Sequence, residues 1–510
     1  MRIKKAIINT AAGGVGTLLA GVLQFVSRII FVQFLSDEYL GISSLFTNIL
    51  SILSLAELGI GTAVGYSLYE PLSNGNTEKI KSIMHFLKHV YFLIGFAIMV
   101  AGILMLPFLP WLIKGTTDLA DLKLIYGLYI IQSATSYWFW AYKSILLQSD
   151  QKLYLIKFYQ VISSFLLTTV QLITLAIFRN FLIYSVIGLM SNMLTNILTA
   201  ITVDRLYPYI KDPSFISLKK NEKKHIFKDV FGIALFKINS TIVSSVDNVL
   251  ISAFIHVKTV ALYGNYQIVI NGISQVTMQL FGGITATIGN LFVEDSKEKS
   301  EFIFRCIQLL CYWIYAFIGI NILVFINPII MTFFGKERVF TNDLVFLQVM
   351  YFIICGFQRT SFIYRDACGL FWKGKLRPVM TAVLNIFISV FLVIRIGLAG
   401  VIWGTILSWI LTTWWYDPIL IYRNVFKKSP ISYFLSYGKA VLITVGMGVI
   451  TVWLSARIPL ENLGGFVLKG FVTVLTPNIG FFIFYHKTPE FFYLKERFLN
   501  CWNGLLKKHN

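Results

Sequence analysis

Charged residues are scarce in this 510-residue chain: they make up 13% of it, about half of what soluble domains carry. Hydrophobic residues make up 56%, and the mean hydropathy is +0.72. These values exclude a soluble enzyme and predict an all-α polytopic membrane protein. Acidic residues are the scarcer kind, with 24 Asp and Glu against 44 Lys and Arg. In a soluble protein this excess would suggest nucleic acid, but loops on one side of a membrane explain it, so we expect no nucleic-acid partner.

Motifs for catalysis are also lacking. The chain has no GxxxxGK[ST] phosphate loop, no HExxH and no Asp-x-Asp pair. Its five cysteines are scattered without a CxxC pair, which favours buried thiols over a metal site. We therefore expect no enzyme chemistry and no metal or other cofactor, apart from a possible coupling H⁺ or Na⁺. ATP is not expected to be the direct energy source.

Apolar runs long enough to cross a bilayer dominate what is present. A helix needs about 20 residues to cross the hydrocarbon core, and fourteen such spans are predicted. They lie at residues 9–34, 40–67, 85–111, 122–147, 154–178, 181–203, 229–255, 260–292, 303–334, 342–368, 377–396, 398–421, 433–455 and 463–485. The first apolar run is too long for a signal peptide, so we interpret it as an uncleaved span.

The distribution of positive charge predicts the orientation. With the N-terminus in the cytoplasm, alternate loops hold 31 Lys and Arg on the cytoplasmic side and 8 on the external side. This split follows the positive-inside rule and supports the span count. Both termini are therefore expected in the cytoplasm. All external loops are short, which leaves no external domain that could hold an active site.

An internal repeat appears when the chain is compared with itself at an offset of about 224 residues. Tyr39 then falls on Tyr263, and LGIGTA (58–63) falls on GGITAT (282–287). The offset contains six spans, so both copies enter the membrane in the same direction. This pattern predicts two six-helix lobes related by a pseudo-two-fold axis along the membrane normal, with two further C-terminal helices.

The domain organisation predicted from this repeat has five parts. They are an N-lobe (1–203), a basic cytoplasmic linker (204–228), a C-lobe (229–425), helices 13 and 14 (426–487), and an amphipathic cytoplasmic tail (488–510). The tail has apolar residues at helical spacing opposite cationic ones. This pattern is typical of an interfacial helix lying on the inner leaflet, with an ordinary surface helix as the alternative.

Five of the charged residues inside the predicted spans are candidate site residues: Arg28, Glu57, Lys237, Asp247 and Arg359. Each would cost roughly 2.5–3.5 kcal/mol in lipid, so all are expected to face an interior. Arg28 and Asp247 lie at similar depth in the equivalent spans 1 and 7, which predicts a pair across the central axis. Structural pairing without a ligand is one interpretation. The other interpretation is a cavity in which Arg28, Lys237 and Arg359 bind an anionic headgroup. Asp247 and Glu57 would then bind a coupling ion or pair with the cationic residues of the cavity.

Two stretches carry a family resemblance. In SRIIFVQFLSDEYLGISSLFTNILSILSLAELGIG (27–61), the features are an Arg late in span 1, Tyr39-x-Gly41 after a short loop, and Glu57 before Leu-Gly. The second stretch is SSVDNVLISAF (244–254) followed by VALY (260–263). Both resemble Wzx-type polysaccharide flippases of the multidrug/oligosaccharidyl-lipid/polysaccharide exporter (MOP) superfamily, at the starts of the two lobes.

The resemblance implies alternating access of two lobes in the bacterial cytoplasmic membrane. The implied substrate is an undecaprenyl-pyrophosphate-linked oligosaccharide, flipped for synthesis of capsule, exopolysaccharide or O-antigen. Arg28 matches a cationic position of the family and is the first candidate for pyrophosphate contact. Implied partners are membrane lipids, a polysaccharide polymerase and glycosyltransferases. A lipid II flippase or a drug/cation antiporter would share the fold, whereas a membrane polymerase or ligase would normally need a large external loop.

Overall fold

The computed structural model describes residues 2–57, 59–114, 122–212, 216–294, 297–368, 370, 372–374, 376–459 and 463–506. Every regular element in these ranges is helical, which confirms the predicted all-α fold class. Within them, nine helices are long and apolar enough to cross a membrane, and Leu18–Phe34 and Thr241–Ile255 are shorter apolar segments. Each of the fourteen predicted spans coincides with one helix or with a helix interrupted by a break.

Two compact units make up the chain: residues 1–276 with 378–405, and residues 277–377 with 406–510. We call them unit 1 and unit 2. The helices of unit 1 are α1 (Arg2–Phe34), α2 (Asp37–Leu53), α3 (Ile60–Ser73), α4 (Thr77–Met105), α5 (Leu109–Leu112), α6 (Leu122–Trp138), α7 (Lys143–Ser149), α8 (Leu153–Phe178), α9 (Phe181–Leu206) and α10 (Lys220–Leu250). Three helices run from one unit into the other: α11 (Val257–Glu294), α15 (Leu376–Ile396) and α16 (Leu398–Trp409). Unit 2 contains α12 (Lys297–Phe334), α13 (Asn342–Phe357), α14 (Arg359–Ala367), α17 (Trp415–Ile421), α18 (Ile431–Ala456), α19 (Leu463–Tyr485) and α20 (Pro489–Leu506). The predicted lobes 1–203 and 229–425 stay a prediction.

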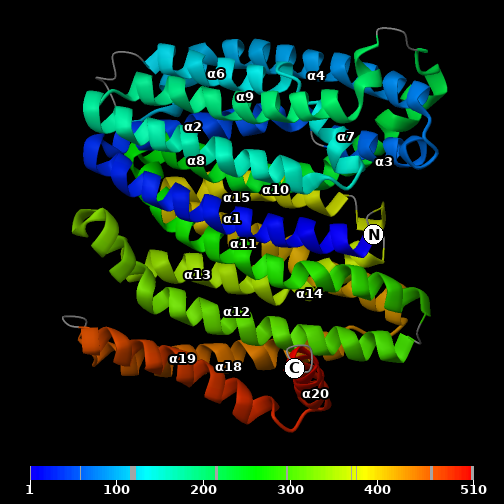
Figure 1. The fold of residues 1–510 in the computed structure, drawn as a ribbon. Coiled ribbons are helices and arrows are strands. Elements are labelled where there is room, and N and C mark those ends of the chain that lie inside the picture. Colours follow the sequence, from blue (N-terminus) through cyan, green and yellow to red (C-terminus); the bar gives the residue numbers. More distant parts are fainter. Residues whose placement is uncertain are drawn as a thin grey trace. The chain divides into compact units, whose positions relative to one another are not determined.

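Unit 1 is a bundle in which neighbouring helices run side by side (Figure 1). Helix α8 packs on α1 and α9, α4 packs on α6, and α10 packs on α2 and α3. The core is aliphatic and aromatic, and the ring of Phe46 meets that of Tyr126 edge-on with centroids 4.8 Å apart. Such close packing fixes the rotation of each helix, which decides where the polar side chains in the spans point.

Two predicted spans in unit 1 are broken rather than continuous. Span 2 changes from α2 to a 3₁₀ turn (Ser54–Glu57), followed by Gly59 with a φ of 98°, before α3 begins. A residue with a Cβ adopts this conformation only with strain, so the break depends on glycine. Span 4 breaks between α6 and α7, where Trp140 has a φ of 52°. In a membrane protein, non-helical backbone at this depth is tolerated only inside protein or beside a water-filled cavity.

The predicted basic linker is fastened to unit 1 by ion pairs. Lys79 of α4 pairs with Glu222 in the first turn of α10, and Lys81 Nζ lies 3.0 Å from Asp212 Oδ2. Lys143 of α7 pairs with Asp204 at the end of α9. The linker is therefore not a free tether, because carboxylates at both of its ends are held by lysines of neighbouring helices.

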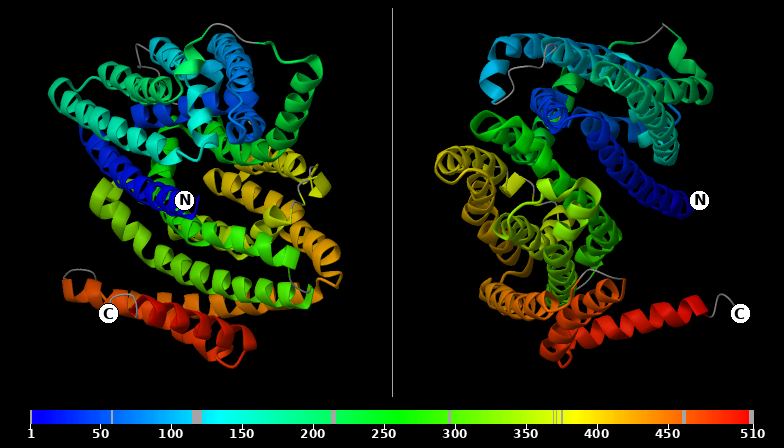
Figure 2. Two further views of the ribbon diagram at one scale, coloured as in Figure 1. Left: turned by 45° about the vertical axis from the view of Figure 1, so that its right-hand side comes forward. Right: turned by 90° about the vertical axis from the view of Figure 1, so that its left-hand side faces the viewer.

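Unit 2 is arranged around α12, which packs on α13, α14, α18, α19 and α20. At one end of α12, the ring of Phe304 contacts Tyr364 at 4.9 Å and Phe426 at 5.4 Å between centroids. Helices α18 and α19 run lengthwise beside α12, whereas α20 runs crosswise to them (Figure 2). Predicted span 10 is broken at Gln358, between α13 and α14.

Candidate transport site

Arg28, in the last two turns of α1, is bound by neutral oxygens. Its Nε donates to Asn265 Oδ1 at 2.5 Å, and its Nη2 donates to the backbone oxygen of Ala261 at 2.8 Å. The guanidinium lies flat against α11, where a Cβ on Gly264 would overlap it. The two hydrogen-bond acceptors of Arg28 are thus uncharged, and the buried carboxylate of Asp37 in α2 interacts with it electrostatically.

The predicted pair of Arg28 with Asp247 is wrong for this structure, because Asp247 has another partner. Asp247 is 7% exposed, and both of its carboxylate oxygens accept from Thr405 Oγ1, at 3.2 and 3.3 Å. Equal depth in two equivalent spans did not fix their rotation: Arg28 points at α11, and Asp247 points at α16.

The surroundings of Asp247 are rich in uncharged oxygen. Asn385 Nδ2 donates to Thr405 Oγ1 at 2.9 Å, while the amide oxygen of Asn385 is buried without a hydrogen-bond partner in the described part of the chain. A buried carboxylate beside such oxygens is stabilised by a proton or by a hard cation. This cluster joins α10, α15 and α16. Among the residues that the structure describes, no three His, Cys, Asp or Glu side chains gather as a transition-metal site would require.

Glu57 lies at the break in span 2 and is held by two phenols. Tyr137 OH donates to its Oε2 at 2.6 Å, and Tyr91 OH donates to its Oε1 at 3.4 Å. The tyrosines come from α6 and α4, so the carboxylate joins three elements of unit 1. Like Asp247, Glu57 is satisfied by neutral donors and keeps the capacity to bind a proton or cation.

Arg359, the first residue of α14, is the candidate cation that the described contacts leave least satisfied. It makes no hydrogen bond or ion pair within the described ranges, and its Nε is buried without an acceptor. Buried N–H groups are nearly always paired, so an orphaned one in a native structure indicates a missing acceptor. Because α14 begins at Arg359, the break in span 10 sets the direction in which this side chain leaves the helix.

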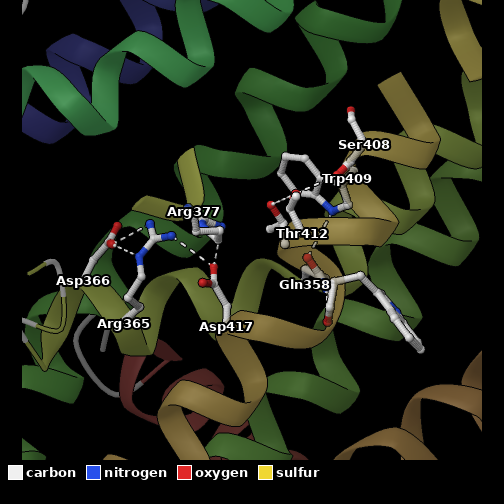
Figure 3. A network of polar contacts seen from close by, with 10 residues as sticks. Gln358, Arg365, Asp366, Arg377, Ser408, Trp409, Thr412 and Asp417 are labelled. Carbon is white, nitrogen blue, oxygen red and sulfur yellow. Dashed lines mark hydrogen bonds and ion pairs between the residues drawn. The ribbon is translucent and has the colours of Figure 1, made fainter. Parts of the chain in front are cut away.

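The side chain of Gln358, the residue at this break, is held by hydrogen bonds from both of its ends, as Figure 3 shows. Gln358 Nε2 donates to the backbone oxygen of Trp414 at 2.6 Å, and Trp409 Nε1 donates to Gln358 Oε1 at 3.1 Å. Trp414 ends a π-helical turn, Ile410–Trp414, that interrupts predicted span 12. Such turns occur often at functional sites. The two irregular backbones are thus tied to each other beside Arg359.

A buried ion network in the same view was not predicted (Figure 3). Asp417 Oδ2 accepts from Arg377 Nη1 at 2.8 Å and from Arg365 Nη1 at 3.1 Å, and Arg365 Nη2 also donates to Asp366 Oδ1 at 2.8 Å. Asp417 is the single acidic residue inside predicted span 398–421, and an acid in an apolar span is enough to predict a buried, paired charge. Unlike Arg359, these two arginines are neutralised by carboxylates. Lys237 lies in α10, but its side chain is outside the described residues.

An apolar groove of about 600 Å³ runs along α18, lined by residues that include Leu435, Leu442 and Met447, with Phe484 of α19 beside them. One cation lies in it: Lys439 Nζ donates to the backbone oxygen of Phe484 at 3.3 Å. The groove therefore combines a hydrocarbon-like surface with one positive charge.

No family model and no curated protein matches the chain. Solved structures do: an inward-facing multidrug resistance MATE family transporter of the MOP superfamily is 15% identical, with a TM-score of 0.63, and the match covers 79% of this chain and 94% of the other. The chain shares the fold of this transporter. The same fold is shared with the lipid II flippase MurJ in an inward closed conformation, at 15% identity and a TM-score of 0.66, over 92% of this chain and 98% of that one. It is also shared with a mutant of the Vibrio cholerae MATE transporter VcmN, at 13% identity and a TM-score of 0.57. This match covers 84% of this chain and 98% of the other. Together with the nine described helices that are long and apolar enough to cross a bilayer, this likeness indicates a multi-pass membrane fold.

Proposed function

We propose that the chain flips an undecaprenyl-pyrophosphate-linked oligosaccharide across the bacterial cytoplasmic membrane, by alternating access and with both termini cytoplasmic. The observation that carries the proposal is Arg359, an arginine in predicted span 10 whose buried Nε has no acceptor among the described residues. A pyrophosphate supplies the missing acceptor, because arginine binds phosphate oxygens bidentately and never deprotonates. Arg28, whose acceptors are neutral, is the second anion-binding residue, and Lys237 the third.

The two uncompensated carboxylates provide the driving force in this proposal. Asp247 and Glu57 take up a coupling H⁺ or Na⁺ from one side and release it on the other. A sugar headgroup has many hydroxyl groups to desolvate, so it needs a polar route through the protein. The lipid tail needs no such route and is accommodated by an apolar surface such as the groove along α18.

Two other functions use the same fold. A lipid II flippase differs only in its substrate, and the likeness to MurJ supports it as the first alternative. A drug/cation antiporter would bind cations, which Arg28 and Arg359 oppose by charge. Transport changes no covalent bond, so we propose no enzymatic step. Glycosyltransferases that build the glycan and a polymerase that consumes it are the proposed partners.

Complementation of flippase-null bacteria separates these functions. Strains that lack a flippase for a defined glycan, strains depleted of the lipid II flippase, and drug-sensitive strains each receive the chain. We expect rescue of surface polysaccharide only, and its loss with Arg359→Ala. Rescue of lipid II-depleted cells, or drug resistance alone, would overturn the proposal in favour of the function rescued.

A further inference from the structure

Helix α20 lies across the end of the membrane helices that it follows. Three residues separate its first residue, Pro489, from the last residue of α19, Tyr485. It runs crosswise to α18 and α19, which span the membrane (Figure 2). A helix that leaves a spanning helix at once and runs crosswise to it lies along the membrane surface.

The first turns of α20 are docked on the spanning helices. Glu490 Oε1 lies 3.3 Å from Arg305 Nε of α12. The ring of Phe491 stacks on Trp313 of α12 and meets Phe482 of α19 edge-on, with centroids 6.0 and 5.8 Å apart. The side of α20 that carries Phe491 is therefore its membrane side.

The same side of α20 continues beyond the bundle. Phe491, Leu494 and Phe498 are spaced i, i+3 and i+7, so they form one stripe. The first two are half-buried against unit 2, whereas Phe498 is 68% exposed. Phe492 and Leu499, also seven residues apart, flank the stripe and are 57% and 46% exposed. Past the edge of the bundle, the membrane side of α20 is thus apolar.

The charges on the exposed turns are mostly positive. Lys495 and Arg497 are exposed, and Glu496 between them is the only acidic residue of these turns, since Glu490 is paired with Arg305. Apolar residues that enter the headgroup boundary and cations beside them are the two elements that bind a helix to anionic lipid. Charge complementarity thus favours a lipid surface over an apolar protein partner.

We propose that the outer half of α20 binds the anionic lipid surface of the adjacent leaflet and thereby braces α12 and α19. Phe498 and Leu499 enter the headgroup boundary, while Lys495 and Arg497 contact lipid phosphates. The inference depends on the geometry of α20 alone and holds for any transported substrate.

Nitroxide labels on the full chain test the proposal. The five native cysteines are replaced by alanine, and Phe498→Cys or Glu496→Cys is introduced; these positions lie on nearly opposite sides of the helix. In vesicles of phosphatidylcholine with phosphatidylglycerol, we expect the label at 498 to collide mainly with oxygen. The control label at 496 should collide mainly with a water-soluble nickel chelate.

Lipid charge is tested with the same labels. Removing phosphatidylglycerol, or adding Lys495→Gln and Arg497→Gln, should reduce the oxygen preference at 498 severalfold. Equal access of the nickel chelate to both labels would overturn the proposal. So would oxygen preference that is indifferent to phosphatidylglycerol, or spin–spin broadening at 498, which would show a second copy of the chain on this face.

Discussion

The buried carboxylate of Asp417 binds two arginines of unit 2, and replacing it with Asn should destabilise the protein strongly. Its side chain is 1% exposed and accepts from Arg365 and Arg377, whose side chains are 11% and 8% exposed. Removing one member of a buried pair costs about 3–5 kcal/mol, because the other charge stays buried. Arg365 keeps Asp366 as a partner, so the loss falls mainly on Arg377. We therefore expect about 3 kcal/mol.

Unfolding of purified protein by SDS in mixed micelles, followed by far-UV circular dichroism, measures this cost. Asp366→Asn is the matched control: it makes the same chemical change, but at a side chain that is 44% exposed, so it should cost about 0–1 kcal/mol. Adding Arg377→Gln to Asp417→Asn should recover part of the loss, since it removes a buried positive charge that has lost its ion pair with Asp417. If Asp417→Asn cost no more than Asp366→Asn, the reasoning about this network would be refuted.

Three further predictions concern unit 1. Gly264→Ala should reduce polysaccharide export with normal membrane insertion, because its methyl group displaces the Arg28 guanidinium. Tyr137→Phe should cost about 1.5–3 kcal/mol in the same SDS titration, because it removes the 2.6 Å hydrogen bond to Glu57. The Lys79 side chain bonds Glu222 and holds the pKa of Glu222 below its ordinary value of 4.5. That contact should therefore persist at neutral pH and be lost as the pH falls through the lowered pKa, with faster proteolysis of residues 204–228.

Each of these has a control in the chain. A Cβ on Gly127 of α6 meets no atom within 4 Å, so Gly127→Ala should leave export unchanged. Tyr91→Phe removes a weaker bond of 3.4 Å and should cost less than Tyr137→Phe. Glu222→Gln should abolish the pH dependence of proteolysis. Normal export by Gly264→Ala, equal costs for the two tyrosines, or an unchanged pH profile would each contradict the corresponding prediction.

The helix order could be predicted from the sequence because spanning segments must be long and apolar, and because loop charge alternates. The breaks could not. Gly59 stands in an apolar run like any small residue, and only packing shows that its φ is positive. The break before Arg359 falls at Gln358, and a glutamine does not predict a helix break as a proline or a glycine would.

The charged residues within the predicted spans led to the candidate site, but the residues that they contact could not be predicted from the sequence. Sequence depth places Arg28 and Asp247 at one level, yet helices that are apolar on all sides give no indication of rotation. Arg28 therefore contacts Asn265 and Asp247 contacts Thr405, neither of which is charged. Polar residues such as these cost little in a span and attract no notice in the sequence.

The central claim is tested most directly by reconstitution. Purified protein in proteoliposomes receives a short undecaprenyl-pyrophosphate-linked glycan with a fluorescent sugar, and a membrane-impermeant quencher reports the leaflet in which the sugar lies. The account predicts saturable flipping that requires an ion gradient, is lost with Arg359→Ala, and is retained with Arg395→Ala, a change at an exposed arginine in the last turn of α15. Flipping at the same rate in protein-free and protein-containing vesicles, or undiminished flipping by Arg359→Ala, would contradict it.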